Sequence, residues 1–233
     1  MKINEFLSSL GPEWGDETAE KLEKLTDLIL EWNEKINVTA IRERDAFIEK
    51  NVIDSLKLAR LPEFRNADRI LDLGTGGGFP GLPLAVLFSD KKFVLADAIA
   101  KKLKVVEDTA HKLGLANVTV IHGRAEDLGR KKELREGFPL VTSRAVANMS
   151  TLSEYCLPFV KQGGCFIAFK TETAEEEVAA AAGAIAKLGG CLVRIDTDAD
   201  GENGHTFAVV KKTSATPKEF PRKAGTPSDK PLK

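Results

Sequence analysis

Apolar residues recur at three- and four-residue steps through the first sixty positions of the chain. A helix capped by Asp16 is predicted from the series Leu22, Leu25, Ile29, Trp32 and Ile36. A second helix is predicted from about Arg44, carrying Phe47, Val52, Leu56 and Ala59, and ending before Pro62. The polar segment Asn37-Val38-Thr39-Ala40-Ile41 lies between them, and its amide and hydroxyl groups either face a ligand or only form the turn.

From about residue 63 to residue 212, short apolar runs alternate with helical stretches. This alternation predicts an α/β domain with a mostly parallel, doubly wound sheet and right-handed crossovers. The runs are 69–73, 92–97, 118–122, 139–143, 165–169, 191–195 and 205–210. Because the turn-rich segment Asp198–Gly204 separates the last two, they predict a hairpin that gives the sheet an antiparallel edge. We expect residues 1–62 to form a helical cap over the mouth of this sheet.

The first apolar run passes into a loop with few side chains, Gly74-Thr75-Gly76-Gly77-Gly78-Phe79-Pro80-Gly81. Glycine lets a ligand approach the backbone closely, and the N-terminus of the following helix offers free N–H groups. Gly76, Gly78 and Gly81 have the spacing of a dinucleotide site, which keeps NAD as an alternative. Asp72, however, would repel a pyrophosphate and suits a positively charged amino group. The segment Leu71–Gly78 resembles the first motif of class I S-adenosylmethionine (SAM) methyltransferases, so SAM is favoured.

Carboxylates also follow the next two predicted strands, where ligands of open α/β sheets bind. Asp97 ends the 92–97 run and either accepts hydrogen bonds from both ribose hydroxyls of the cofactor or caps the following helix. The 118–122 run leads into Ala125-Glu126-Asp127. In the methyltransferase pattern this turn contacts adenine, partly through the backbone N–H groups of Ala125 and Glu126, and the alternative is a solvated acidic turn.

Composition is ordinary for a soluble globular protein, with 233 residues of which 42% are hydrophobic and a mean hydropathy of -0.17. No stretch approaches eighteen apolar residues, and the first residues have no secretory apolar core, so we expect a cytoplasmic protein without a membrane segment. The cysteines are Cys156, Cys165 and Cys191, and the histidines are His111, His122 and His205. Their number and isolation favour core or surface roles over disulfides, and no metal site is expected.

The charge of the chain is unevenly distributed. Of 34 basic and 35 acidic residues, seven basic and two acidic ones lie in residues 211–233, which leaves 27 basic and 33 acidic residues before them. Residues 213–233 are therefore interpreted as a basic tail that either binds a polyanion or is merely solvated and disordered.

The end of the 139–143 run, Ser143-Arg144-Ala145, indicates which atom is methylated. Enzymes that methylate exocyclic adenine or glutamine amides have an Asn-Pro-Pro-Tyr-like motif at this place. A purine N7 carries a lone pair and no proton, so its methylation needs placement rather than a general base. Arg144 either holds the methionine carboxylate or a substrate oxygen, or forms a structural ion pair.

Over nearly its whole length the chain resembles the bacterial small-subunit ribosomal RNA guanine-N7 methyltransferases, the RsmG or GidB family. The resemblance rests on the segments already quoted and on Asp54-Ser55-Leu56, Arg124-Ala125-Glu126, Lys170 and the ending Phe220–Pro227 with Pro231-Leu232. It implies transfer of the SAM methyl group to N7 of a guanine in the decoding-region loop of 16S rRNA. It also implies cofactor contacts at Gly74, Phe79, Ala125, Glu126 and Arg144.

Cofactor contacts are expected from Asp72, Gly74, Gly76, Gly78, Phe79, Asp97, Ala125, Glu126 and Arg144, and substrate positioning from Arg144 and Asn37. The RNA backbone, as naked 16S rRNA or in the 30S particle, is expected to contact Lys170, Lys211, Lys212, Lys218, Arg222, Lys223 and Lys230. We expect truncation after Lys212 to leave SAM affinity intact, and Phe79 or another aromatic to cover the guanine. The sequence indicates no obligate protein partner.

One residue departs from the family pattern, because Asn51 stands where members commonly carry a His before the Asp-Ser element. Asn cannot take up a proton near neutral pH, so a packing or hydrogen-bonding position is expected. Two other functions stay open from the sequence: an NAD-dependent oxidoreductase, and a non-catalytic ribosome-associated RNA-binding factor.

Overall fold

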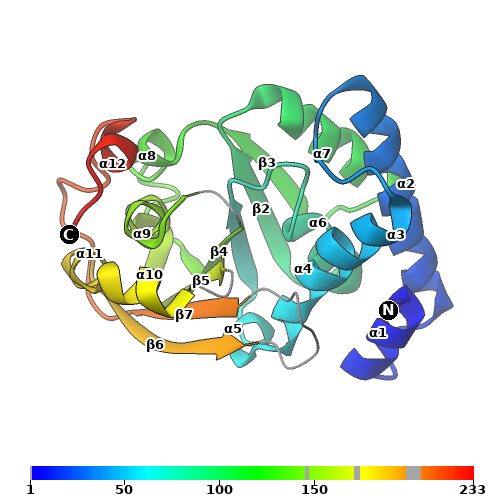
Figure 1. Cartoon of the computed structure of the whole chain (residues 1–233), viewed down its shortest axis with the longest axis horizontal. Coiled ribbons are helices and arrows are strands. Elements are labelled where there is room, and N and C mark those ends of the chain that lie inside the picture. The colour runs from blue at the N-terminus through cyan, green and yellow to red at the C-terminus, as the bar shows by residue number, and fades with distance from the viewer. Residues whose placement is uncertain (1, 145–146, 171–173, 198–205) are drawn as a thin grey trace. The chain divides into compact units, whose positions relative to one another are not determined.

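The computed structural model describes residues 2–144, 147–170, 174–197 and 206–233, which contain seven strands (Figure 1). The strands are β1 (Arg69–Leu73), β2 (Lys92–Asp97), β3 (Val118–His122), β4 (Phe138–Arg144), β5 (Val160–Lys170), β6 (Gly190–Thr197) and β7 (Thr206–Lys212). They form one sheet in the order β3-β2-β1-β4-β5-β7-β6.

Most strand pairs are parallel, and β7 alone among the described strands runs against its neighbours β5 and β6. The predicted α/β class with an antiparallel edge hairpin is confirmed, and the antiparallel strand itself lies second from the edge, inside β6. The predicted turn Asp198–Gly204, with His205, lies outside the described residues.

The chain divides into two compact units, which are residues 1–68 with 75–122, and residues 69–74 with 123–233. These units do not coincide with the three segments expected from the sequence. Residues 213–233, expected to be a separate tail, belong to the second unit.

The first unit holds all of the described helices that precede β2. They are α1 (Ile3–Leu10), α2 (Asp16–Lys35), α3 (Arg44–Phe47), η1 (Ile48–Ile53), α4 (Asp54–Leu56), η2 (Lys57–Arg60), α5 (Pro62–Arg65) and α6 (Gly81–Leu87), followed by α7 (Ala100–Lys112) after β2. The helix predicted from Asp16 is confirmed as α2, although its N-cap is Gly15 and Asp16 lies in the first turn, where a negative charge favours the helix dipole.

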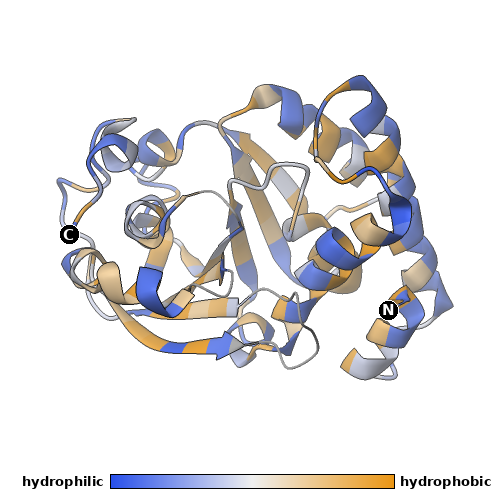
Figure 2. Ribbon diagram, in the orientation of Figure 1, coloured by the Kyte–Doolittle hydropathy of each residue, from blue (hydrophilic) through white to orange (hydrophobic). Residues whose placement is uncertain are grey.

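The second predicted helix is continuous from α3 to η2, but its middle is a π-helix and its end a 3₁₀ helix. It ends before Pro62, as predicted, and Pro62 then begins α5, where a missing N–H costs nothing. In α2 the residues Leu22, Leu25 and Ile29 are fully buried, and α2 packs against α6 and α7. Figure 2 shows hydrophobic and hydrophilic patches alternating along α2, as expected for a helix with one buried face.

The second unit packs its helices around a central one. These helices are α8 (Ala125–Leu128), α9 (Met149–Cys156), η3 (Leu157–Phe159), α10 (Ala174–Ala180), α11 (Ala182–Lys187) and α12 (Thr226–Asp229). α9 contacts β4, β5, α8, α10, α11 and α12. The core of the neighbouring strands is apolar, since Phe166, Ile167 and Val209 have no exposed surface.

Lys212 at the end of β7 is buried rather than exposed. Its amine donates hydrogen bonds to the carbonyl oxygens of Leu157 (2.8 Å) and Leu188 (3.3 Å) and to the hydroxyl of Thr216. The prediction that Lys212 binds RNA is therefore wrong, because all of these partners are internal. Burial lowers the pKa of Lys212 to about 8, although the carboxylate of Glu136 at 3.5 Å opposes that shift.

The Lys212→Met variant tests this buried amine through the pH dependence of stability. Between pH 8 and about 10.4, the unfolded chain holds the Lys212 proton while the folded chain has lost it, so the wild-type free energy of unfolding should rise with pH relative to the variant. The rise should reach at most about 1.4 kcal/mol per pH unit, measured by urea denaturation. Lys211→Met, at the exposed neighbour, is the control, and a wild-type-to-Lys212→Met difference that is flat above pH 8 would contradict the assignment.

Candidate functional site

The loop that leaves β1 has the backbone conformation that its glycines predict. Gly74, Gly76 and Gly78 have φ values of 74°, 58° and 97°, which side chains of L-residues rarely adopt. A Cβ on Gly78 would collide with Leu82, whereas a Cβ on Gly76 would have no atom within 4 Å. The backbone at Gly76 is therefore open to the approach of a ligand.

Asp97 at the end of β2 holds this loop through its carboxylate. One oxygen accepts a hydrogen bond from Gly76 N (2.8 Å) and the other accepts one from Ile99 N (2.8 Å), just before α7. The N-cap of α7 is Ile99, so Asp97 supports the start of the helix without being its cap residue. Each carboxylate oxygen has a second lone pair, which leaves acceptor capacity for ribose hydroxyls.

The Asn37–Ile41 turn lies against the same loop. The side-chain oxygen of Asn33 accepts hydrogen bonds from Val38 N (2.8 Å) and Thr39 N (3.0 Å). A Cβ on Gly77 would lie 2.5 Å from Cγ1 of Val38, so the turn and the loop are in close contact. Asn37 itself is exposed. Asn33 was not predicted as a site residue, and its signal in the sequence was its position four residues after Ile29, on the apolar face of the predicted helix.

Two further predictions concern side chains that the structure buries. The ring of Phe79 packs edge-on against Phe47, with centroids 5.5 Å apart and an interplanar angle of 81°, and it is 6% exposed. It is therefore not placed to cover a guanine, and the backbone of Phe79 remains the candidate contact. Asn51 is buried in η1, as expected for a packing position. The hydrogen bond that it accepts from the Ser55 hydroxyl goes to its backbone carbonyl and not to its side chain.

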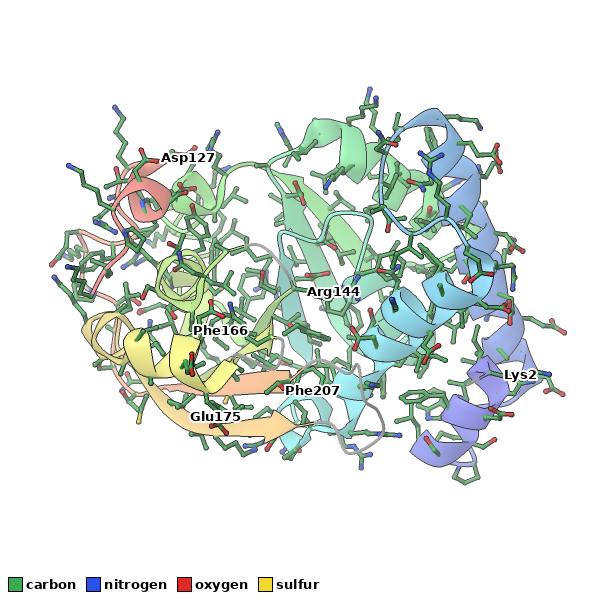
Figure 3. The ribbon with its side chains drawn as sticks, in the orientation of Figure 1. Lys2, Asp127, Arg144, Phe166, Glu175 and Phe207 are labelled. Carbon is green, nitrogen blue, oxygen red and sulfur yellow. The ribbon has the colours of Figure 1, made fainter. Side chains whose placement is uncertain are left out.

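In the second unit, candidate residues lie toward the carboxyl ends of neighbouring parallel strands. Asp72 in β1 is fully buried and pairs in register with Thr142 of β4. Arg144 ends β4 in register with Phe169 of β5, and Figure 3 shows its position. Ser143 ties the two strands together by donating a hydrogen bond to the carbonyl of Leu73 (2.7 Å). Ala145, the third residue of the predicted motif, lies outside the described residues.

Lys170 at the end of β5 forms its contacts with residues inside the protein. Its amine forms an ion pair with Glu177 of α10 (2.7 Å) and donates a hydrogen bond to the carbonyl of Ala147 (3.0 Å). The same Glu177 oxygen accepts a hydrogen bond from Met149 N (2.6 Å), at the start of α9. Because Lys170 is only 8% exposed, the prediction that it binds the RNA backbone is wrong.

The cysteines have the core and surface positions expected of them, with Cys156 and Cys165 buried and Cys191 exposed, all as free thiols. Burial raises the pKa of the Cys156 thiol well above its usual value, and the charge of Asp72 adds to that rise while Lys170 opposes it. Cys156 is therefore a neutral thiol and no nucleophile.

The Ala125-Glu126 pair, expected to contact adenine through backbone N–H groups, begins α8. The first N–H groups of a helix have no acceptor within it, so Ala125 N is suited to such a contact. The Glu126 side chain is occupied differently: it is 3% exposed and accepts a hydrogen bond from Gly225 N (2.8 Å).

The basic residues of the chain's end divide into two groups. Lys211, Lys218, Lys223 and Lys230 are exposed. Arg222 instead donates through its backbone N and its guanidinium to the fully buried Glu154. The predicted RNA contact of Arg222 therefore competes with a strong internal ion pair.

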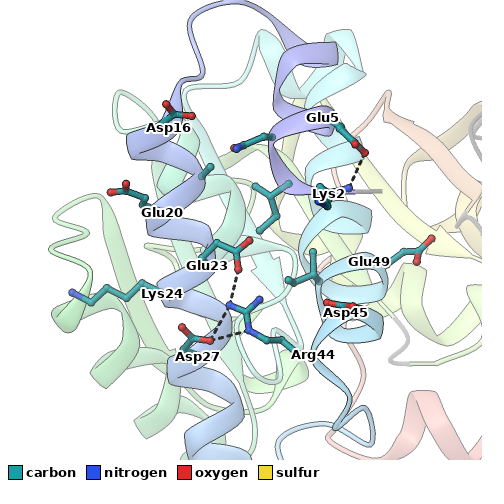
Figure 4. Close-up of a pocket in the computed structure, with 14 residues that line it drawn as sticks. Lys2, Glu5, Asp16, Glu20, Glu23, Lys24, Asp27, Arg44, Asp45 and Glu49 are labelled. Atoms are coloured by element: carbon teal, nitrogen blue, oxygen red, sulfur yellow. Dashed lines mark hydrogen bonds and ion pairs between the residues drawn. The ribbon is translucent and has the colours of Figure 1, made fainter.

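A separate open hollow of about 950 Å³ lies among α1, α2, α3 and η1 (Figure 4). Seven carboxylates and three cations line it, and none of the predicted cofactor residues does. Arg44 bridges Glu23 (2.6 Å) and Asp27 (3.0 Å) across one side. The excess of negative charge makes this surface unfavourable for an RNA phosphate.

Among the described residues, no group of three or more His, Cys, Asp or Glu side chains is placed to hold a metal ion. No helix in that part of the chain combines the length and apolar character needed to cross a membrane.

Comparison with known proteins decides the family. The family model described as rRNA small subunit methyltransferase G, GidB, matches residues 18–203. The chain belongs to this family. Among other GidB relatives, the ribosomal RNA small subunit methyltransferase G of Clostridium perfringens strain 13 is 46% identical over 97% of this chain and 95% of its own length. That of Clostridium novyi is 42% identical over 99% of this chain and 96% of its own length.

Solved structures support the fold of this GidB member. The O-methyltransferase TomG from Streptomyces achromogenes, crystallised with SAM, superposes with a TM-score of 0.56 at 17% identity, over 91% of this chain and 96% of TomG. The family and the class I methyltransferase fold predicted from the sequence are confirmed. Nothing in these comparisons supports the NAD-dependent oxidoreductase alternative.

The contact between the Asn37–Ile41 turn and the glycine loop can be tested by a double-mutant cycle. Gly77→Ala should lower the free energy of unfolding by roughly 1–3 kcal/mol, because the new methyl group is forced against Val38. In a Val38→Ala background the same change should cost less, giving a coupling of roughly 0.5–3 kcal/mol in urea denaturation. Strictly additive effects would show that the two segments do not touch in solution.

Proposed function

We propose that this GidB-family member transfers the methyl group of SAM to N7 of a guanine in the decoding-region loop of 16S rRNA. It would act in the cytoplasm, on the free RNA or on the 30S particle. The observation that carries the proposal is the glycine loop whose backbone is open at Gly76 and fixed by the Asp97 carboxylate. The family relationship narrows the methyl acceptor to ribosomal RNA of the small subunit.

The residues present suit SAM, which supplies an electrophilic methyl group on its sulfonium. Asp97 would accept the ribose hydroxyls with its remaining lone pairs, and the backbone of Ala125 and Glu126 would contact adenine. Asp72 would attract the amino group and Arg144 the carboxylate of the methionine part. Gly74, Gly76, Gly78 and Phe79 would contribute backbone close to the ligand.

Methylation of guanine N7 requires the protein to position the two reactants and does not require a general base. N7 of guanine carries no proton, so its lone pair could accept the methyl group that SAM would supply without the help of a general base, and the protein would need only to place the two in line. The exposed Asn37 and the guanidinium of Arg144 are the polar groups proposed to orient the guanine. A neutral Cys156 and a non-titrating Asn51 are consistent with this demand, since neither is needed for proton transfer.

Asp97→Ala should weaken SAM binding at least tenfold, or about 1.4 kcal/mol, because it removes both the loop anchor and the ribose acceptor. Isothermal titration calorimetry without RNA measures the change. Asp90→Ala, at an exposed carboxylate of the same unit, is the matched control and should bind as the wild type does. Equal affinity of the Asp97→Ala variant would remove Asp97 from the cofactor site.

Methyl transfer itself is tested with labelled SAM and 30S particles from a strain that lacks the modification. Label should enter 16S rRNA, and mass spectrometry of the digested RNA should identify N7-methylguanosine. SAM binding without incorporation into particles or free RNA would favour a non-catalytic RNA-binding factor. Binding of NADH in place of SAM would favour the oxidoreductase.

The exposed lysines of the chain's end are proposed to bind the RNA backbone. Replacing Lys218, Lys223 and Lys230 together with Gln should weaken RNA binding and reduce the salt dependence, by about 0.7–0.9 in the log–log slope for each phosphate that the variant no longer neutralises. Lys2→Gln with Lys24→Gln, in the acidic hollow, is the control and should leave the slope unchanged. A triple variant with the wild-type slope would place the RNA elsewhere.

A further inference from the structure

Residues 216–230, here called the C-terminal segment, are bound to the second unit along their whole length. Arg135 donates to the carbonyls of Thr216 (2.8 Å) and Phe220 (2.8 Å), and Glu136 accepts a hydrogen bond from Thr216 N (2.7 Å). Further along, Thr151 of α9 donates to the carbonyl of Pro227 (2.9 Å) in a buried position. A segment held by so many internal bonds has a structural task besides carrying charge.

Its central anchor is the pair of Arg222 and Glu154. The fully buried Glu154 carboxylate accepts from Arg222 N (2.7 Å), Nε (2.9 and 3.1 Å) and Nη2 (2.6 Å). Arg222 Nη2 also donates to the carbonyl of Lys230 (2.8 Å), which closes the segment into a loop around α12. Removing the guanidinium would leave an uncompensated buried charge on α9.

The C-terminal segment contacts both ends of α8. At the first turn, Gly225 N donates to the carboxylate of Glu126 (2.8 Å). At the other end, a Cβ on Gly129 would lie 3.1 Å from Cγ of Pro221, so the backbone there packs directly on the proline ring. Figure 1 shows α8 and α12 beside α9, which contacts both. Because α8 has a single turn, its own hydrogen bonds cannot fix its position.

We infer that the C-terminal segment is a positioning element for the cofactor: through Gly225 and Pro221 it fixes α8, whose backbone at Ala125 and Glu126 presents N–H groups to adenine. The inference rests on the proposed function, since it concerns how the same cofactor is held. It replaces the expectation that the end of the chain affects RNA binding alone. By linkage, if an ordered segment favours SAM, then SAM favours an ordered segment.

The first test measures SAM affinity by calorimetry on the full-length chain without RNA. Arg222→Ala should bind SAM at least fivefold more weakly, and Arg222→Lys, which keeps the charge but loses the two-point contact, should fall between it and the wild type. Glu219→Ala, an exposed change in the same segment, should bind as tightly as the wild type. Thermal unfolding of each variant gives the folded fraction by which the affinities are corrected.

The second test uses the wild-type chain and avoids any loss of folding. Trypsin cleavage after Lys223 requires the segment to open, so saturating SAM should slow that cleavage at least threefold. If the wild type binds no SAM, the proposed function fails. If it binds SAM while Arg222→Ala binds equally well, or while SAM leaves the cleavage rate unchanged, the positioning role is overturned and the proposed function stands.

Discussion

The hydrogen bond from Gly76 N to the carboxylate of Asp97 is the interaction on which the proposed chemistry most depends. A loop of glycines lets a ligand approach the backbone closely because it has few side chains. For the same reason it lacks the side-chain contacts that would fix its conformation. The loop is therefore held from outside, by Asp97 on one side and by Val38 on another. Positioning without a general base is useful only if the backbone that does the positioning is rigid.

The second unit also contains two carboxylates that accept hydrogen bonds from backbone N–H groups. Glu126 accepts from Gly225 N, and Glu154 accepts from Arg222 N, so in each case a buried carboxylate orders a segment that has little regular structure of its own. Charge-assisted hydrogen bonds to backbone N–H groups are strong and directional. Such contacts also make the carboxylates costly to replace, because the partly buried N–H groups would lose their acceptor.

Periodicity and motif spacing were sufficient to predict the strands, the helix of residues 16–35 and the glycine loop, since these depend on local patterns. They did not predict the contacts of the chain's end. Charge composition indicates which residues prefer water, but it does not identify the carboxylates with which the basic residues form ion pairs. One signal was available: adjacent strand residues face opposite sides, so Lys211 and Lys212 could not both contact one RNA strand. Lys211 is exposed and Lys212 is buried, as that rule requires.

The two roles proposed for the chain's end are physically compatible because they would use different atoms. Lys218, Lys223 and Lys230 present exposed amines, whereas Arg222 and Gly225 use N–H groups directed into the second unit. RNA that binds the amines would order the segment further, and an ordered segment holds α8 in place. Binding of the two substrates is then coupled through one piece of chain, with no requirement that either touches the other. An enzyme built this way would hold SAM most tightly when RNA is present, which limits the trapping of cofactor on idle protein.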